Sequence, residues 1–394
     1  MSIRFVTAGE SHGRGLVVIL EGIPAGLTVN SEDIDVELAR RQKGFGRGQR
    51  MKIETDTVKI LSGLRHARTL GSPIALYIEN KDWDNWKGTM SPALDDFDGN
   101  MLLKPRPGHA DLAGFMKYGV SDFRDILERA SARETAARVA AGAVCKELLK
   151  EFDISIISYT LQIGKAAADM SKIPQDKIWH NTETSYVRCP DAGAGKKMIQ
   201  LIKQAASKGD TLGGKFAVAA HNVPIGLGSH TQWDLKLDGR LAQSLMSVQA
   251  IKTVEFGSGV KLASTPGSLS HDEIFYNDKK GFYRNTNRAG GIEGGMSNGE
   301  PIEITCTMKA IPSLVKPLRS VNINTKKAAK AEAVRSDVCA VPAAGVVAEA
   351  AVAFELARAM KEKFGGDCIE DMKKAIANYE SRIKAAKEAI ANYE

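Results

Sequence analysis

The chain has 394 residues, of which 43% are hydrophobic and 26% charged, so it can build a large core and is not a disulfide-stapled miniprotein. Its formal net charge is +7, but residues 1–138 hold 13 of the 21 Arg and only 7 of the 33 Lys, and net +1. Arg is a planar, bidentate ligand of carboxylate and phosphate, whereas Lys suits solvated surfaces. This distribution therefore indicates small anionic ligands and disfavours a diffuse nucleic-acid-binding face.

The five cysteines are far apart and include no C-x-x-C pair, which argues against a disulfide framework and against a zinc site. The first residues lack the apolar segment of a signal peptide, and no run of 18 apolar residues occurs. We therefore expect a reduced, cytoplasmic protein with no bound metal and with neither a membrane nor a nucleic acid as partner.

Three apolar runs predict strands, because each is preceded by Gly or Pro and is rich in residues that favour strands: 16–20, 74–78 and 302–308. Residues 31–43 predict a helix that is capped by Asn30 or Ser31 and ends in basic residues. Ser131 and Glu134 form a capping-box pattern that opens an Ala-rich helix to about residue 150. Pro342 opens another helix, which extends to the glycines at 365–366.

These strands form antiparallel-looking clusters without strict strand–helix alternation, which predicts an α+β fold. The Lys-rich segment 151–215 is expected to be a peripheral excursion. No linker divides the chain, so we expect one domain over residues 1–366 and an amphipathic helical tail over 367–394. The tail repeats Ala-Ile-Ala-Asn-Tyr-Glu at an offset of 14 residues, which places both copies on one helix face, either docked on a neighbour or exposed.

Two glycine-containing segments near the N-terminus carry candidate functional side chains. His12, between Gly9 and Gly13, is either a general acid or base at neutral pH or a turn histidine whose ring has ordinary partners. The Gly- and Arg-rich segment 44–51 either folds over a multiply charged small ligand or is an RNA-binding or plain surface loop.

Further candidates follow along the chain. Prolines on both sides of Arg106 stiffen residues 104–111, which holds a catalytic side chain in place or forms a structural turn. Four arginines surround the helix start at Ser131, which predicts either an anion site or a salt-bridged helix. The Gly-rich segment 287–299 is either a backbone-lined cofactor pocket or a lid, and residues 334–337 add an Arg and a carboxylate. The chain contains neither G-x-G-x-x-G after a strand nor a P-loop.

Five segments resemble, in order, the motifs of the chorismate synthase family: Gly-Glu-Ser-His-Gly (9–13), Arg-Pro-Gly-His-Ala-Asp (106–111), Arg-Ala-Ser-Ala-Arg-Glu-Thr (129–135), Gly-Gly-Met-Ser-Asn-Gly (294–299) and Arg-Ser-Asp (335–337). The resemblance covers about residues 3–362. It implies a carbon–oxygen lyase of the shikimate pathway of aromatic amino acid biosynthesis, which eliminates phosphate from 5-enolpyruvylshikimate 3-phosphate in an anti-1,4 sense and gives chorismate. It also implies an α+β sandwich with a helical layer between antiparallel sheets, assembled as a homotetramer.

The resemblance further implies reduced FMN, which lends an electron transiently because the C–H bond that breaks is not acidic. His12 would protonate the reduced flavin, His109 the departing phosphate, and Asp337 would assist in removing the ring hydrogen. The implied flavin contacts are Arg129, Ala130, Ser131, Gln249, Ala250, Gly294, Lys309, Ala310, Ile311, Pro312, Ser313 and Arg335. The implied contacts of substrate anions are Ser11, Arg41, Arg47, Arg50, Arg106 and Arg133, and Arg41 and Arg47 would also contact NADP. The family often has Pro directly after the residue matching Lys309, whereas Ala310 stands there.

Two other functions differ from the lyase in what they predict. An RNA-binding module would lose affinity steeply with added salt, but the Arg-rich segment lacks interleaved aromatic residues. A flavin reductase would oxidise NADPH, the possible reductant of the flavin, without any phosphorylated substrate.

Overall fold

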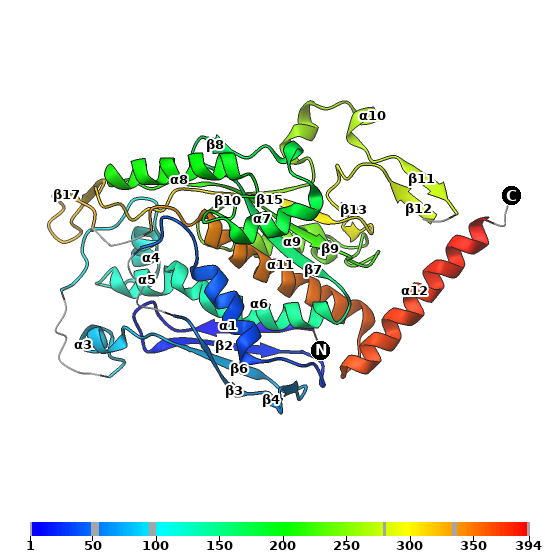
Figure 1. Ribbon diagram of the computed structural model, residues 1–394. Helices are drawn as coiled ribbons and strands as arrows, with labels where there is room; N and C mark the ends of the chain where they lie inside the picture. Colours follow the sequence, from blue (N-terminus) through cyan, green and yellow to red (C-terminus); the bar gives the residue numbers. More distant parts are fainter. Residues whose placement is uncertain (1, 49–54, 94–99, 279–280, 333–336, 392–394) are drawn as a thin grey trace.

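Two antiparallel sheets enclose a layer of helices in the computed structural model, which describes residues 2–48, 55–93, 100–278, 281–332 and 337–391 (Figure 1). The first sheet has the strand order β1-β2-β6-β3, with bounds β1 Arg4–Ala8, β2 Gly15–Glu21, β6 Ile74–Glu79 and β3 Val58–Ser62. The second has the order β10-β15-β9-β7-β8, with bounds β10 Ile251–Phe256, β15 Ile302–Met308, β9 Gly214–His221, β7 Ser155–Ile163 and β8 Ala166–Ala167.

Two long helices, one on each sheet, form most of the layer between them. Helix α6 (Thr135–Lys150) packs on the first sheet and α11 (Val341–Phe364) packs on β7 and β9 of the second. The two helices also pack on each other, and α1 (Ser31–Gln42) lies against both. This arrangement confirms the expected α+β sandwich with a helical layer between antiparallel sheets.

The remaining elements are shorter or peripheral. The other helices are α3 Lys87–Met90, α4 Asp111–Tyr118, α5 Arg124–Ala130, α7 Ile178–Thr184, α8 Ala192–Ser207, α9 Leu237–Met246, α10 Gly267–Ser270 and α12 Ile369–Ala391. Two-stranded ribbons pair β4 Leu64–Arg65 with β5 Arg68–Thr69, β11 Ile274–Asn277 with β12 Gly281–Arg284, β13 Ile292–Glu293 with β14 Met296–Ser297, and β16 Arg319–Val321 with β17 Ala328–Lys330. Short 3₁₀ turns cover 83–85, 132–134, 170–172, 175–177, 233–235 and 259–264. Among these described helices, none is both long enough and apolar enough to cross a membrane.

Most of the predicted elements are confirmed within a residue or two, but the details at two helix starts differ. Asn30 occupies the cap of α1, yet its side-chain amide donates to Asp33 (3.1 Å) instead of accepting from the helix. Ser131 caps a 3₁₀ turn by accepting from the backbone N–H of Arg133, whereas Glu134 bonds to side chains of other elements. The capping box is therefore only half formed.

The prediction that residues 151–215 are a peripheral excursion is wrong. Strand β7 runs beside β9 in the second sheet, and its alternate residues Ile156, Ser158 and Thr160 are buried. Helix α8 is strongly amphipathic, with Met198 and Ile202 in the core. Lysines on the solvent side of α8 raise the basic content without removing the segment from the core.

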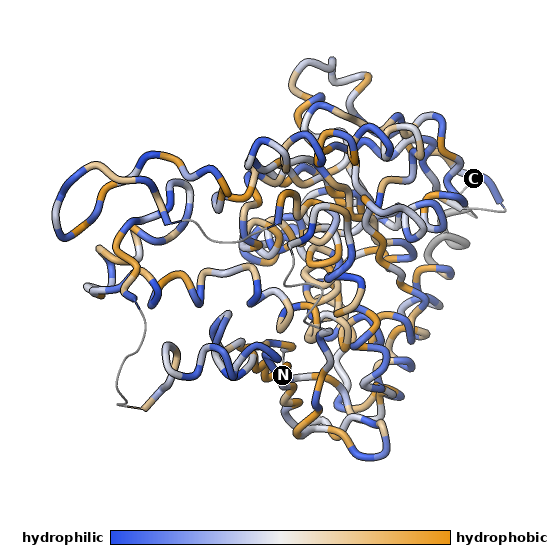
Figure 2. The backbone as a smooth tube through the Cα atoms, turned by 60° about the vertical axis from the view of Figure 1, so that its left-hand side comes forward, coloured by the Kyte–Doolittle hydropathy of each residue, from blue (hydrophilic) through white to orange (hydrophobic). Residues whose placement is uncertain are grey.

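Small residues allow the central helices to approach closely. A Cβ built on Gly142 of α6 would lie 2.4 Å from the Cβ of Ala350 in α11, so only glycine fits at this crossing. Almost every residue of α11 up to Met360 is buried, and the central helices carry mostly hydrophobic colours in Figure 2. The apolar core of the molecule therefore lies in this helical layer and on the sheet faces against it.

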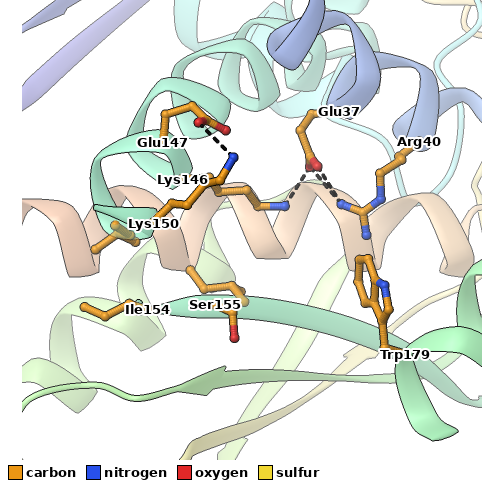
Figure 3. A pocket seen from close by; sticks show the side chains of 10 residues that line it. Glu37, Arg40, Lys146, Glu147, Lys150, Ile154, Ser155 and Trp179 are labelled. Carbon is orange, nitrogen blue, oxygen red and sulfur yellow. Dashed lines mark hydrogen bonds and ion pairs between the residues drawn. The ribbon is translucent and has the colours of Figure 1, made fainter. Parts of the chain in front are cut away.

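A cluster of charges is buried where α1, α6 and α11 meet. The carboxylate of Glu349, which is fully buried, accepts from Arg40 (2.7 and 3.0 Å), Lys146 (2.6 Å) and Arg188 (3.1 Å). On the outer side of this cluster, Glu37 bridges Arg40 and Lys146. The bridge lines a hollow of about 190 Å³, where the guanidinium of Arg40 lies over the ring of Trp179 (Figure 3). Because its cations are already paired, we interpret this hollow as a structural feature and not as an anion site.

The C-terminal helix is attached to both halves of the fold. Cys368, just before α12, forms a parallel bridge with Ala25 of the N-terminal half. The hydroxyl of Tyr379 donates to the backbone carbonyl of Ile225 (2.9 Å), and its ring centroid lies 4.0 Å from the ammonium nitrogen of Lys363. The first copy of the tail repeat is thus docked on the sandwich.

Candidate active site

His12 lies in the loop between β1 and β2 and is held by a buried carboxylate from α5. Its Nδ1 is 2.9 and 3.0 Å from the two carboxylate oxygens of Glu128, and its backbone N–H donates to Oε2 of the same residue (2.8 Å). The imidazole stacks on Trp86, with ring centroids 3.9 Å apart. A histidine held in this way has a fixed orientation and a defined nitrogen for proton transfer.

His109 has a similar arrangement in the Pro-stiffened loop before α4. Its Nδ1 is 2.5 Å from Asp111, which also accepts from the Nε of Arg106 (2.9 Å) and from its Nη2 (3.1 Å). Burial by itself raises the pKa of Asp111, but the hydrogen bonds and charges of His109 and Arg106 outweigh it and hold the pKa well below its usual range. Arg106 is 6% exposed and donates to Ser313 as well (2.8 Å).

A loop from the second sheet contacts the His109 loop. Lys309, directly after β15, donates through Nζ to the carbonyl of Gly108 (2.5 Å), and burial lowers the pKa of this lysine. Its backbone N–H donates to Ala250 (2.9 Å), a residue with a φ of +68°, in the left-handed region that a side chain disfavours. The turn at 249–250 and the strand end at 309 are therefore fixed relative to His109.

Buried arginines connect the start of α6 to the first sheet. Arg133 donates to both oxygens of Asp56 (2.6 and 2.7 Å) and to Asn80 (2.9 and 3.1 Å). Arg41 is 4% exposed and bonds to Thr135 (2.9 Å) and Asp56 (3.3 Å). Burial lowers the pKa of Arg41 to about 10, partly opposed by the charge of Asp56.

Asp337 contacts the Gly- and Arg-rich segment. Its carboxylate accepts from Arg47 (Nη1 to Oδ2, 2.7 Å) and from the backbone N–H of Gly48 (2.6 Å). The charges of Arg47 and Asp337 both act on Arg41, which places this pair beside the Arg133 cluster. The segment is therefore folded onto the rest of the site, at least as far as residue 48.

A second row of contacts joins β1 to the turn at 249–250. Arg129 donates to the backbone and hydroxyl of Thr7 (2.9 and 2.7 Å), and Thr7 donates to Glu134 (2.9 Å). Glu134 in turn accepts from the side-chain amide of Gln249 (3.3 Å). Ser131 donates to Ser11 (3.2 Å), beside His12.

The structure thus brings most of the predicted site residues into one network of contacts and neighbouring charges, in which the Arg47–Asp337 pair is joined to Arg41 by its charge: Ser11, His12, Arg41, Arg47, Arg106, His109, Arg129, Ser131, Arg133, Gln249, Ala250, Lys309, Ser313 and Asp337. The described contacts do not join Gly294 to this network, and Ala130, Ala310, Ile311 and Pro312 lie in it through their chain neighbours. Arg50 and Arg335 lie outside the described residues.

The network contains a buried polar atom that a ligand could satisfy. The carbonyl oxygen of Gln249 is buried without a hydrogen-bond partner among the described residues, and a buried polar atom of this kind costs free energy unless a ligand satisfies it. Outside this network, a Cβ on Gly294, whose φ is +60°, would meet no described atom within 4 Å, so the backbone there faces open space. Arg129 and Lys309 supply positive charge, so the residues around Gln249 fit a ligand that bears an anionic group.

Several functional partners were missed by the sequence reasoning: Thr7, Asp56, Asn80, Trp86 and Glu128. Each is far in sequence from the residue that it contacts, as Glu128 is from His12. Asp111 belongs to the 106–111 motif and lies two residues after His109. This short spacing is the sequence signal from which their contact could be predicted.

The fold and site together define an enzyme of the α+β class, in which two carboxylate-bound histidines lie among buried arginines suited to a polyanionic ligand. Residues 3–360 match the family model described as chorismate synthase. The chorismate synthase of Endomicrobium trichonymphae is 74% identical, over 97% of this chain and 100% of that protein. That of Desulforudis audaxviator is 53% identical, over 97% and 98%. A crystal structure of chorismate synthase superposes with a TM-score of 0.80 at 43% identity, covering 98% of this chain and 99% of that one. The chain belongs to the chorismate synthase family and is a lyase.

Proposed function

We propose that this chain eliminates phosphate from 5-enolpyruvylshikimate 3-phosphate in an anti-1,4 sense to give chorismate, in the shikimate pathway. The observation that carries the proposal is the pair of histidines, each bound through Nδ1 to a buried carboxylate, within one network with four buried or half-buried arginines. The substrate bears a phosphate and two carboxylates, so guanidinium groups suit its binding. A proton donor would assist the departure of the phosphate.

Reduced FMN, when bound, would lend an electron transiently and so permit cleavage of a C–H bond that is not acidic. The cofactor would be held by Arg129, Ala130, Ser131, Gln249, Ala250 and the 309–313 segment. Gly294 and Arg335 are further predicted contacts. His12 would donate a proton to the reduced cofactor, and His109 to the departing phosphate. Asp337 would assist in removing the ring hydrogen.

The arginines divide by burial into two roles in this proposal. Arg41, Arg106 and Arg133 are each 4–6% exposed and bonded to Asp56, Asp111 or Asn80. They would act on the substrate through the positive potential that they maintain and through the groups that they hold. Arg47 is less buried, and with Arg50 it would reach the substrate anions directly, while Ser11 would add a hydroxyl.

We extend the proposal to the setting of the enzyme. NADPH would be a possible reductant of the flavin, with Arg47 in direct contact and the buried Arg41 acting through its charge. The chain would act in the cytoplasm, which agrees with the absence of disulfides among its five cysteines, all of them described. It would assemble as a homotetramer of one catalytic domain, residues 1–366, with residues 367–394 as a helical tail.

The test is anaerobic turnover of enolpyruvylshikimate phosphate by the purified chain with reduced FMN, with chorismate and phosphate measured together. Release of both in equal amounts is expected, and no release would refute the proposal. His12→Ala and His109→Ala should each lower kcat about 10²–10⁴-fold, the usual contribution of a general acid. Variants that fold and turn over at the wild-type rate would contradict the roles of the two histidines. Oxidation of NADPH without substrate would identify a flavin reductase.

A further inference from the structure

Three hydrogen bonds attach the His12 loop to Glu128. The Nδ1 of His12 and its backbone N–H both contact the carboxylate, and the backbone N–H of Ser11 donates to the backbone carbonyl of Glu128 (3.1 Å). The side chain of Glu128 is 1% exposed. The carboxylate is thus fixed both to the ring and to the loop that carries the ring.

The ring is also fixed on one face. Trp86 stacks on it at an interplanar angle of 26°, and the indole N–H donates to Asp82 (2.9 Å). The guanidinium of Arg124 lies over the same indole (5.5 Å) and 3.8 Å from Glu128. The imidazole is therefore restrained in rotation as well as in position.

We infer that Glu128 is the positioning residue of His12, which keeps the Nδ1 proton in place and leaves Nε2 as the nitrogen that exchanges a proton with the reacting partner. This rests on the proposed role of His12 in the elimination. A carboxylate only accepts hydrogen bonds, so Nδ1 remains protonated in both states of the ring. In the transfer, the Nε2–H bond breaks, its electron pair stays on the ring, and the proton passes to the acceptor.

The two histidine–carboxylate pairs are not equivalent. Arg106 bonds to both oxygens of Asp111, and its Nη2 is also 2.9 Å from the Nδ1 of His109. Much of the charge of Asp111 is thus neutralised by Arg106. The cation of α5 that faces Glu128, Arg124, is 3.8 Å away, beyond hydrogen-bond distance. Glu128 therefore has more of its charge available to orient its histidine than Asp111 has.

The experiment reads the proton position directly and does not depend on turnover. The full chain, labelled with ¹⁵N in its seven histidine rings, is examined by solid-state NMR, and His12→Gln assigns the His12 signals. The neutral ring of His12 should carry its proton on Nδ1. In Glu128→Gln, the amide oxygen is drawn to the backbone N–H of His12, so the NH₂ group faces Nδ1 and the proton should move to Nε2.

Turnover supplies the second readout. Glu128→Gln should lower kcat about 10- to 100-fold, as loss of an orienting partner does at other sites, with an unchanged KM for the substrate. Glu128→Asp, which retains a carboxylate, should keep Nδ1 protonated and recover part of kcat. Asp125→Asn makes the same chemical change on the exposed side of α5 and should alter neither readout.

A wild-type ring with its proton on Nε2 would overturn the inference, and so would a kcat of Glu128→Gln within twofold of the wild-type value. If Glu128→Gln does not fold, the wild-type spectrum and Glu128→Asp decide the question. Absence of wild-type turnover would instead refute the proposed function, and the proton position would remain measurable.

Discussion

Replacing Glu349 with Ala should destabilise the fold severely, because three cations depend on this one carboxylate. Arg40, Lys146 and Arg188 all donate to it, and Ser158 donates as well (2.6 Å). Glu37 and Glu183 pair with the same cations, so the wild-type cluster has three positive and three negative charges. The variant leaves one buried positive charge without compensation.

Breaking a buried pair in this way costs about 3–5 kcal/mol. The assay is the free energy of unfolding from urea titration at pH 7. Glu147→Ala provides a matched control beside the same hollow, because the partner of Glu147 is the exposed Lys150 at 3.5 Å (Figure 3). An exposed pair contributes about 0–1 kcal/mol. Equal losses of unfolding free energy in Glu349→Ala and Glu147→Ala would refute the argument that the buried cations depend on Glu349.

The pH dependence follows from the direction of the pKa shift. Burial by itself raises the pKa of Glu349, but Lys146, Arg40 and Arg188 outweigh it and hold the pKa well below its ordinary value. The contribution of Glu349 is therefore complete above the unfolded pKa of about 4.3 and declines as the pH falls toward the folded pKa. The difference between wild type and Glu349→Ala should narrow when unfolding is measured at successively lower pH below about 5.

Two further variants test other parts of the structure. Asp111→Asn leaves the buried Arg106 without its counter-charge and should cost about 3–5 kcal/mol in urea unfolding; a loss below 1 kcal/mol would show that the pair is dispensable. Gly142→Val places a side chain against Ala350 at the crossing of α6 and α11, and overpacking of this kind costs at least about 1–3 kcal/mol. Gly239→Ala, where a Cβ meets nothing closer than 3.8 Å, is its control, and an equal loss in both would contradict the steric argument.

The elements that could be predicted are those whose pattern is local. Strands β2 and β6 are continuous apolar runs, and β15 alternates apolar residues with Glu and Thr. Helix α11 begins with Pro and ends before Gly, so each of these elements reveals its bounds without a partner. Strand β7 alternates buried and half-buried residues among lysine-rich neighbours, and the average composition of 151–215 concealed it. A segment's composition describes its solvent side as much as its buried side.

Only part of the site could be predicted, because some of its contacts join residues that are close in the sequence and others join residues that are far apart. Arg106, His109 and Asp111 lie within six residues, and the two prolines mark the loop that holds them. Glu128, by contrast, is recognisable as the partner of His12 only once α5 is packed against the β1–β2 loop. Reasoning from a motif identifies the reactive side chain and leaves its support undetermined.

The position of α11 between the sheets has a consequence for synthesis of the chain. The first sheet is complete in sequence by residue 79 and α6 by residue 150, yet the helix that joins them to the second sheet begins only at residue 341. Until then, α6 and the inner face of β7 and β9 lack the surface that covers them. The nascent chain therefore carries uncovered apolar surface through much of its translation, which is the condition under which partly folded chains aggregate.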